Sequence, residues 1–240
     1  MRLALIGYGT MGKIIEEVAI SRGHTITAKS NRTFPIEQID FSQVDVAIEF
    51  TAPNLAVDHM KYCINQKTPV VVGTTAWNDE LPAVKNYAKT NDGSLLYASN
   101  FSIGVNIFFD INRRLAKLMA SYPEYKVHDS ETHHTAKLDA PSGTAVSIAN
   151  DILFENDELS SWIHKENELP VTQKNQFGVT SYRKEGVPGT HHVTYASEID
   201  TLELSHTAHN RQGFALGAVV AAEWLQHKKG VFTMQDVIKF

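Results

Sequence analysis

Near its amino terminus the chain reads Leu3-Ala4-Leu5-Ile6-Gly7-Tyr8-Gly9-Thr10-Met11-Gly12. The four apolar residues predict a short buried strand, and apolar residues at helical spacing from Met11 to Val18 predict a helix. Between them lies the spacing G-x-G-x-x-G. Its glycines permit a tight turn, close approach of a pyrophosphate to the backbone, and tight packing of helix on strand. The alternative is a glycine-rich turn without a ligand. The candidate cofactor-binding residues are Gly7, Tyr8, Gly9, Thr10, Met11 and Gly12.

The rest of the first hundred residues repeats this alternation of strand and helix. Further strands are expected at 25–29, 44–48, 70–72 and 94–98, and helices at 54–65 and 79–90. Short, nearly continuous apolar strands separated by helices are typical of a parallel sheet that is covered on both faces. The sequence therefore predicts an α/β protein that begins with a Rossmann-type, doubly wound parallel sheet.

The pattern changes after Asn100. Two helices, one over 107–118 and one ending near 153, precede strands expected at 180–184, 190–196 and 201–208. This order predicts an α+β domain with an open mixed sheet. The polar stretch 155–176 has little periodicity and is interpreted as a mobile excursion of that domain.

A last apolar helical face, from Phe214 to Leu225, is expected to return to the first domain. The predicted organisation is a dinucleotide-binding domain over 1–102, completed by 212–240. A substrate-binding and oligomerisation domain is predicted over 103–211.

The segment after the expected second strand indicates which cofactor is used. An acidic residue there would bind the ribose 2′-hydroxyl of NADH. The chain instead has Lys29-Ser30-Asn31-Arg32-Thr33, whose guanidinium, amide and hydroxyls suit a 2′-phosphate. NADPH is therefore the expected cofactor, with NADH possible, and Asn31, Arg32 and Thr33 are candidate contacts. The alternative is that Lys29 and Arg32 are solvated loop charges.

Residues 131–144 read E-T-H-H-T-A-K-L-D-A-P-S-G-T and carry the strongest chemical signal. His133 can exchange protons near neutral pH, and Lys137 is a cation and a proton donor. Ser142-Gly143-Thr144 leads into an apolar helical run whose first N–H groups would bind a carboxylate. By itself, Ser-Gly-Thr is an ordinary helix start. The combination predicts a pocket for a small anionic molecule that must be protonated.

A metal site is the competing interpretation of the histidines. The possible ligands are His133, His134, Asp139, His191 and His192. Adjacent histidines cannot both face one ion from a regular helix or strand, and the chain lacks the Cys or HExxH spacing of common metal sites. No metal is therefore expected.

Composition restricts the classes of function. The chain has 240 residues, and its 22 basic and 27 acidic side chains give a net charge of −5. Without a basic cluster, no nucleic-acid partner is expected. A single cysteine, Cys63, excludes an intramolecular disulfide and suits the cytoplasm. The apolar run at Met1–Ile6 is too short for a signal peptide or a membrane span, so neither export nor a membrane partner is expected.

With both motifs placed, the chain closely resembles the 4-hydroxy-tetrahydrodipicolinate reductase family, formerly called dihydrodipicolinate reductases, of diaminopimelate and lysine biosynthesis. The resemblance spans nearly the whole chain. Besides the glycine loop it rests on Gly73-Thr74-Thr75, Ala98-Ser99-Asn100-Phe101-Ser102, the signature from Glu131 to Ala145, and Gly189-Thr190-His191-His192-Val193.

The resemblance implies roles for individual residues. His133 matches the general acid/base and Lys137 the proton donor. The positions that match substrate-binding residues are His134, Ser142, Gly143, Thr144 and Thr75. Those that match cofactor-contacting loops are Gly7 to Gly12, Gly73, Thr74, Thr75, Ala98, Ser99, Asn100 and Phe101. Family members are usually homotetramers formed through the sheet of the second domain.

The implied reaction is NAD(P)H-dependent reduction of 4-hydroxy-tetrahydrodipicolinate, a small cyclic dicarboxylate, to tetrahydrodipicolinate with loss of water. Three positions depart from the family pattern: Thr10, where arginine is frequent, Ala76, where glycine is common, and Ser99, where proline is common. The alternatives are a Rossmann dehydrogenase for another amino or keto acid and a non-catalytic NADPH-sensing module. Neither needs the whole signature from His133 to Thr144.

Overall fold

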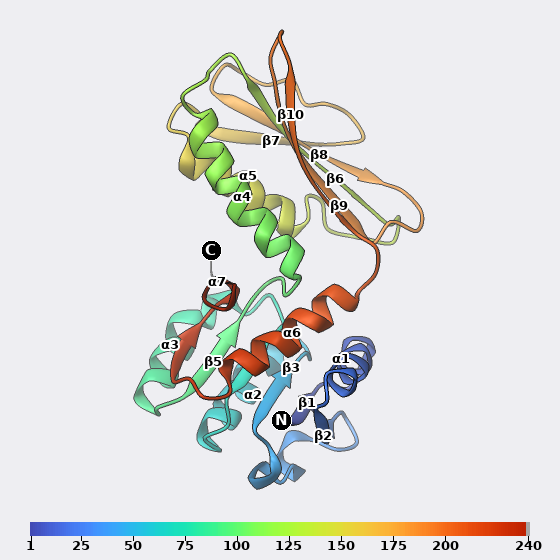
Figure 1. Cartoon of the computed structure of the whole chain (residues 1–240), viewed down its shortest axis with the longest axis vertical. Coiled ribbons are helices and arrows are strands. Elements are labelled where there is room, and N and C mark those ends of the chain that lie inside the picture. The colour runs from blue at the N-terminus through green and yellow to red at the C-terminus, as the bar shows by residue number, and fades with distance from the viewer. Residues whose placement is uncertain (239–240) are drawn as a thin grey trace. The chain divides into compact units, whose positions relative to one another are not determined.

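The computed structural model describes residues 1–238, and these residues form two compact units. The first unit comprises Met1–Ile103 and the segment from Gln212 onward, and the second comprises Gly104–Arg211. The last two residues of the predicted range 212–240 lie outside the described residues. Figure 1 shows the elements of each unit.

The first unit is built on a six-stranded parallel sheet with the order β11-β5-β4-β3-β1-β2. Its strands are β1 (Arg2–Ile6), β2 (Thr25–Ser30), β3 (Val46–Glu49), β4 (Val70–Val72), β5 (Ser94–Tyr97) and β11 (Gly230–Phe232). From β1 the chain passes to β2 on one side and then to β3 on the other. The predicted Rossmann-type, doubly wound sheet is confirmed, and β11 adds a sixth strand that the sequence did not predict.

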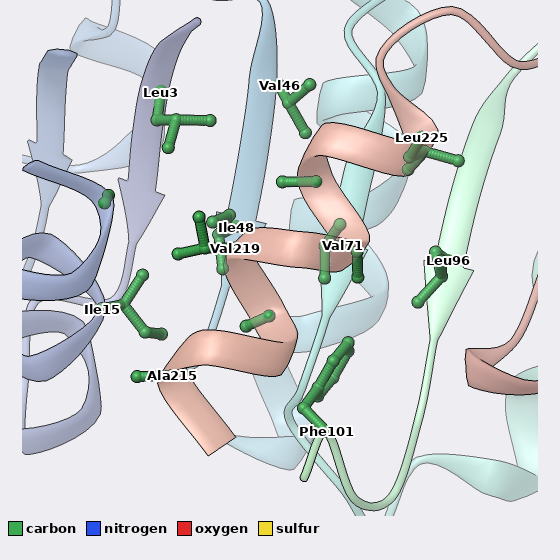
Figure 2. Packing of buried hydrophobic residues seen from close by; sticks show 14 of the residues in the cluster. Leu3, Ile15, Val46, Ile48, Val71, Leu96, Phe101, Ala215, Val219 and Leu225 are labelled. Atoms are coloured by element: carbon green, nitrogen blue, oxygen red, sulfur yellow. The ribbon is translucent and has the colours of Figure 1, made fainter. Parts of the chain in front are cut away.

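Helices cover both faces of this sheet because successive strand residues point to opposite sides. Leu3 and Leu5 pack on the side of α1 (Thr10–Ser21) and α6 (Gln212–Leu225), whereas Ala4 and Ile6 pack on the side of α2 and α3. Figure 2 shows the first side, where Ala215, Val219 and Leu225 of α6 face strand side chains. The remaining helices of the unit are α2 (Pro53–Asn65), α3 (Leu81–Thr90), α7 (Met234–Val237) and the short 3₁₀ turns η1 (Ile36–Gln38), η2 (Phe41–Gln43) and η3 (Asn78–Glu80).

The second unit has a five-stranded mixed sheet with the order β10-β9-β6-β8-β7. Strands β6, β9 and β10 pair antiparallel, whereas β6, β8 and β7 pair parallel. Helices α4 and α5 cover one face, where Phe108 and Ile148 of the helices share a core with Val179 and Val193 of the strands. The elements are α4 (Ile103–Met119), β6 (Lys126–His133), α5 (Gly143–Glu155), β7 (Ser161–Glu166), β8 (Gln176–Arg183), β9 (Gly189–Ala196) and β10 (Thr201–Ala208). The predicted α+β unit with a mixed sheet is confirmed.

Two strands of this sheet were not predicted. The stretch 155–176, interpreted as a mobile excursion with little periodicity, contains edge strand β7, which the sequence did not predict. This strand is only half-buried and has no apolar alternation. Central strand β6 was hidden for another reason: its inward positions include Asp129, Glu131 and His133, polar residues where a strand pattern requires apolar ones.

Several element boundaries also differ from the sequence expectations. Strand β3 begins at Val46 rather than residue 44, and β8 begins four residues before the expected 180. No helix within residues 1–238 is both long and apolar enough to cross a membrane.

Candidate active site

The candidate cofactor residues of the first unit occupy loops at one edge of its sheet. Because all paired strands are parallel, the loops that follow β1, β3, β4 and β5 emerge at the same carboxyl-terminal edge. These loops contain Gly7–Gly12, Gly73–Thr75 and Ala98–Phe101. Open α/β sheets bind ligands at this edge, where the strand order reverses. Here the reversal is at β1, directly before the glycine loop.

The glycine loop is tightly constrained. The backbone N–H groups of Gly7 and Tyr8 both donate to the carbonyl of Ser30, at 3.2 and 2.9 Å. Gly7 has a φ of 95°, and a Cβ there would lie 2.2 Å from the Phe50 carbonyl oxygen. At Gly9, by contrast, a Cβ would meet no described atom within 4 Å. The loop therefore leaves the backbone of Gly9 open to a ligand, as close approach of a phosphate requires.

The two cationic side chains near the end of β2, Lys29 and Arg32, differ in whether they already have an ion-pair partner. Lys29 Nζ lies 2.5 Å from Glu16 Oε1 and over the Tyr8 ring. Asn31 Oδ1 accepts the backbone N–H groups of Thr33 and Phe34, which fixes this turn. Arg32 is exposed and makes no hydrogen bond or ion pair with the described residues. Of the two cations, Arg32 is thus the one available for a 2′-phosphate.

The Gly73-Thr74-Thr75 loop contains one inward and one outward threonine. Thr74 is buried: its hydroxyl accepts the Thr51 N–H at 2.7 Å, and its carbonyl accepts the Trp77 indole N–H at 2.7 Å. Thr75 is exposed. Ala76 has a φ of 62°, where a side chain costs about 1 to 2 kcal/mol, so glycine suits this position better. Phe101 is only 2% exposed and belongs to the core, so its backbone rather than its ring is the available contact.

In the second unit, β6 and β9 bring three buried titratable groups together. Glu131 and His133 are two residues apart on β6 and share a face, and Glu131 pairs in register with His191 of β9. Glu131 Oε2 lies 3.4 Å from His133 Nδ1 and 4.0 Å from His191 Nδ1. The two imidazole rings are 5.2 Å apart in an edge-to-face arrangement.

The other oxygen of Glu131 fixes the start of α5. Oε1 accepts the backbone N–H of Ser142 at 2.8 Å and the hydroxyl of Ser181 at 2.7 Å. Ser142 is the N-cap residue, and its hydroxyl accepts the Ala145 N–H at 3.2 Å. Gly143 is exposed, and a Cβ there would have no described atom within 4 Å. The amino terminus of α5 is therefore both rigidly held and open, as an anion site requires.

Two cations border this cluster. Lys137 Nζ donates to both carboxylate oxygens of Asp139, at 2.7 and 2.9 Å. Arg183 donates to the Asp139 carbonyl at 2.8 Å, and its Nη1 lies 4.0 Å from Glu131 Oε1. Lys137 is close enough for its charge to lower the pKa of His133. Asp139 thus connects Lys137 to Arg183, which lies beside the Glu131 carboxylate.

The protonation states follow from burial and these neighbours. Burial lowers the pKa of His133; Glu131 opposes that change, whereas Lys137 and Arg183 reinforce it. Burial tends to raise the pKa of Glu131, but hydrogen bonds from Ser142 and Ser181 and the nearby His133 outweigh it, so the net pKa is lowered. At neutral pH the site therefore contains an ionised Glu131 beside a neutral His133.

Comparison with known proteins identifies the family of this chain. Residues 1–101 match the family model "Dihydrodipicolinate reductase, N-terminus", and residues 104–238 match "Dihydrodipicolinate reductase, C-terminus". The chain belongs to the dihydrodipicolinate reductase family. It is 44% identical over 238 residues to a 4-hydroxy-tetrahydrodipicolinate reductase of Christiangramia forsetii, covering 99% of this chain and 98% of that protein. The reductase of Pseudoalteromonas atlantica is 35% identical, over 90% of this chain and 79% of its own.

Solved structures share the fold of this reductase-family chain. A dipicolinate-bound dihydrodipicolinate reductase from Paenisporosarcina sp. TG-14 superposes with a TM-score of 0.77, at 23% identity and 99% coverage of both chains. An amine dehydrogenase from Mycobacterium smegmatis gives a TM-score of 0.61 at 10% identity, covering 96% of this chain and 94% of its own.

The sequence did not identify three residues of the cluster around His133 as site residues. Glu131 lay inside the quoted signature without a role, His191 was considered only as a metal ligand, and Arg183 was not singled out. The i, i+2 spacing of Glu131 and His133 was the available signal, and it needed β6 to be recognised as a strand. His191 and Arg183 required the strand register as well.

Three buried side chains of the second unit could together hold a metal ion. One ligand atom each from Glu131, His133 and His191 lies within 4.8 Å of the others. This combination contains no adjacent pair of histidines: within residues 1–238, neither His134 nor His192 belongs to it. Lys137 and Arg183 oppose a cation here, since their charges lower the pKa of His133. These two cations therefore weaken the case for a metal ion at this cluster.

His191 should make this fold sensitive to acid. Burial lowers its pKa from 6.5 to about 3. Between these values the unfolded chain binds a proton that the folded chain does not, so stability falls as pH decreases below 6.5. This group can contribute a slope of up to about 1.4 kcal/mol per pH unit. Urea unfolding at pH 7 and pH 5 should show a smaller loss of stability in His191→Gln than in the unsubstituted protein. Equal losses would contradict the assignment.

Proposed function

We propose that this chain catalyses the NAD(P)H-dependent reduction of 4-hydroxy-tetrahydrodipicolinate to tetrahydrodipicolinate, with loss of water, in diaminopimelate and lysine biosynthesis. The observation that carries this proposal is the 44% identity, over nearly the full length of both chains, to a protein named 4-hydroxy-tetrahydrodipicolinate reductase. The geometry of the second unit supports it, because a neutral imidazole, an ammonium and an open helix start meet at one site.

The substrate is expected to bind through its carboxylates. The amino terminus of α5 presents the N–H groups of Gly143 and Thr144, and Glu131 holds this terminus through Ser142. The solved Paenisporosarcina relative was determined with dipicolinate, a planar ring dicarboxylate. We expect dipicolinate to bind here at the same helix start, with Lys137 released from Asp139 to contact it. His134, half-exposed at the end of β6, is a further substrate contact in this proposal.

The reaction divides into loss of water, hydride addition and protonation. Departure of the 4-hydroxyl and a ring proton leaves a conjugated C=C–C=N system. When bound, the reduced nicotinamide supplies a hydride to C4. Lys137 and His133 supply the proton that the ring then requires. Each of these roles for a residue is part of the proposal.

NADPH is the proposed cofactor in preference to NADH. Arg32→Ala should raise KM for NADPH about 10- to 100-fold, because a charge-assisted hydrogen bond to the 2′-phosphate is lost. KM for NADH, which lacks that phosphate, should change little. Lys29→Ala is the matched control, since Lys29 is already paired with Glu16. Steady-state kinetics with both cofactors decides this, and an equal loss for NADH and NADPH would contradict the proposal.

The protein is proposed to be a cytoplasmic homotetramer. The sheet of the second unit packs its helices on one face, which leaves the other face for a homotetramer. Light scattering should then give about four times the chain mass of 26.7 kDa, and a monomer would refute it. A cytoplasmic location is proposed because Cys63, the single cysteine, is buried as a free thiol.

The direct test is oxidation of NADPH with freshly prepared 4-hydroxy-tetrahydrodipicolinate. Substrate-dependent oxidation with formation of tetrahydrodipicolinate is expected. Oxidation only with another amino or keto acid would favour the general dehydrogenase alternative. Binding of NADPH without turnover of any such substrate would favour a sensing module.

A further inference from the structure

Glu131 divides its two carboxylate oxygens between two parts of the candidate site. The side chain is fully buried, and Oε1 is saturated by the Ser142 N–H and the Ser181 hydroxyl. Oε2 accepts no hydrogen bond from the described residues. An ionised carboxylate oxygen buried without a donor is costly, so a proton should lie nearby to stabilise it.

Among residues 1–238, the imidazoles of His133 and His191 lie close enough to Oε2 to supply that proton. The nearer nitrogen is His133 Nδ1, at 3.4 Å, and His191 Nδ1 follows at 4.0 Å. Both nitrogens are buried and lack a hydrogen-bond partner among residues 1–238. A proton on His133 Nδ1 would therefore satisfy both that nitrogen and Oε2 after a shift of a few tenths of an ångström.

The opposite edge of the His133 ring lies against a glycine. A Cβ at Gly189 would be 3.0 Å from Nε2 and 3.2 Å from Cδ2. Glycine at this point of β9 therefore avoids a tight contact between a side chain and Nε2. If Nδ1 holds the proton that faces Glu131, then Nε2 is the basic nitrogen and the one that can exchange a proton with a ligand.

We propose that Glu131 is a positioning residue that fixes the Nδ1–H tautomer of His133 with Oε2 while it anchors the carboxylate-binding start of α5 with Oε1. Nothing in the family comparison assigns this role, and its catalytic consequence rests on the proposed function. One rigid carboxylate then sets the distance between the substrate anion and the nitrogen that exchanges protons. Buried carboxylates hold catalytic imidazoles in one tautomer in this way.

Other charges around His133 do not replace Glu131. Lys137 and Arg183 are cations and disfavour the imidazolium, and His191 is a neutral ring. Asp139 is the other nearby anion, and it is engaged by Lys137. Loss of the Glu131 charge should therefore lower the pKa of His133 further. No other described group would then favour the Nδ1–H tautomer.

The tautomer can be observed without any assay of activity. Long-range ¹⁵N–¹H correlation spectra distinguish protonated from bare ring nitrogens, and a His133→Asn variant assigns the His133 signals. The unsubstituted protein should show the proton on Nδ1. In Glu131→Gln, the amide can place its NH₂ toward Nδ1 while its oxygen still accepts from Ser142, so the proton should move to Nε2.

The matched control is Asp129→Asn. Asp129 is a second fully buried carboxyl on the same face of β6, two residues away. Burial, and then the charge of Glu131, raise its pKa well above the usual value, which favours the uncharged form that Asn imitates. Asp129→Asn should therefore leave the His133 tautomer, its pKa and turnover as they are.

Kinetic measurements on Glu131 variants distinguish a role in positioning His133 from a role in stabilising the fold alone. Glu131→Gln should lower kcat about 10²- to 10⁴-fold. Dipicolinate affinity should stay within about threefold, because the amide oxygen still holds Ser142. The pH profile should shift toward acid with the pKa of His133. Glu131→Asp, which keeps the charge, should recover part of the rate.

Three results would overturn the proposal. The first is an Nε2–H tautomer of His133 in the unsubstituted protein, a measurement that needs no variant to fold. The second is an unchanged tautomer and pH profile in folded Glu131→Gln. The third is stoichiometric bound metal in the purified protein, which would make Glu131, His133 and His191 a metal site. If the tautomer behaves as expected but 4-hydroxy-tetrahydrodipicolinate is not reduced, the proposed function fails and the positioning role stands.

Discussion

His133→Ala and Lys137→Ala are each expected to lower kcat about 10²- to 10⁴-fold, the range for loss of general acid–base assistance. His133 loses the imidazole that burial keeps neutral beside Glu131, and Lys137 is the ammonium whose charge acts on that ring. NADPH binding should be nearly unchanged, because the glycine loop belongs to the other unit.

The matched control for these variants is His227→Ala. His227 is an exposed histidine after α6 in the first unit, and its loss should leave turnover unchanged. Steady-state rates with NADPH and 4-hydroxy-tetrahydrodipicolinate provide the measurement. Because the two groups are expected to act on one proton transfer, the double variant should be little slower than the slower single variant. Normal turnover in both single variants would remove these residues from the mechanism.

Gly217→Ala should have the largest effect on stability, a loss of about 3 kcal/mol or more in the free energy of unfolding. Gly217 is buried in α6, and a Cβ there would lie 1.6 Å from the carbonyl oxygen of Phe101. No rotamer change can relieve a clash with backbone, so either α6 or the Phe101 segment must move. The gain in helix propensity, about 1 kcal/mol, is too small to compensate.

Gly213→Ala on the same helix is the matched control. A Cβ there would meet only the Ser102 hydroxyl oxygen, at an ordinary 3.7 Å. Its free energy of unfolding should change by less than about 1 kcal/mol. Urea unfolding of the two variants makes the comparison. If both glycines tolerate alanine equally, the close packing of α6 on the Phe101 segment is wrong.

The fold of the first unit could be predicted because burial on both faces leaves a plain signal. Its strands are apolar at consecutive positions, as in Val46-Ala47-Ile48 and Val70-Val71-Val72. The short edge strand β11 lacks that signal, since all of its residues are only half-buried.

The fold of the second unit was harder to predict because polar residues of its site interrupt the apolar alternation of a strand. Strand β6 has Asp129, Glu131 and His133 at inward positions, so the alternation of a half-buried strand is carried partly by polar side chains. Two of these residues, Glu131 and His133, belong to the candidate site. His133 and Lys137 were found from their chemical types, whereas Glu131 and Arg183 became visible only through their contacts. The roles of all these residues stay predictions until variants are measured.

The most direct test of the central claim is the rate of NADPH oxidation with freshly prepared 4-hydroxy-tetrahydrodipicolinate, measured side by side for the unsubstituted protein and for a His133→Ala, Lys137→Ala double variant. We predict substrate-dependent oxidation by the unsubstituted protein and a rate at least about 10²-fold lower in a double variant that still binds NADPH. No oxidation by the unsubstituted protein, or an equal rate in the double variant, would contradict the account.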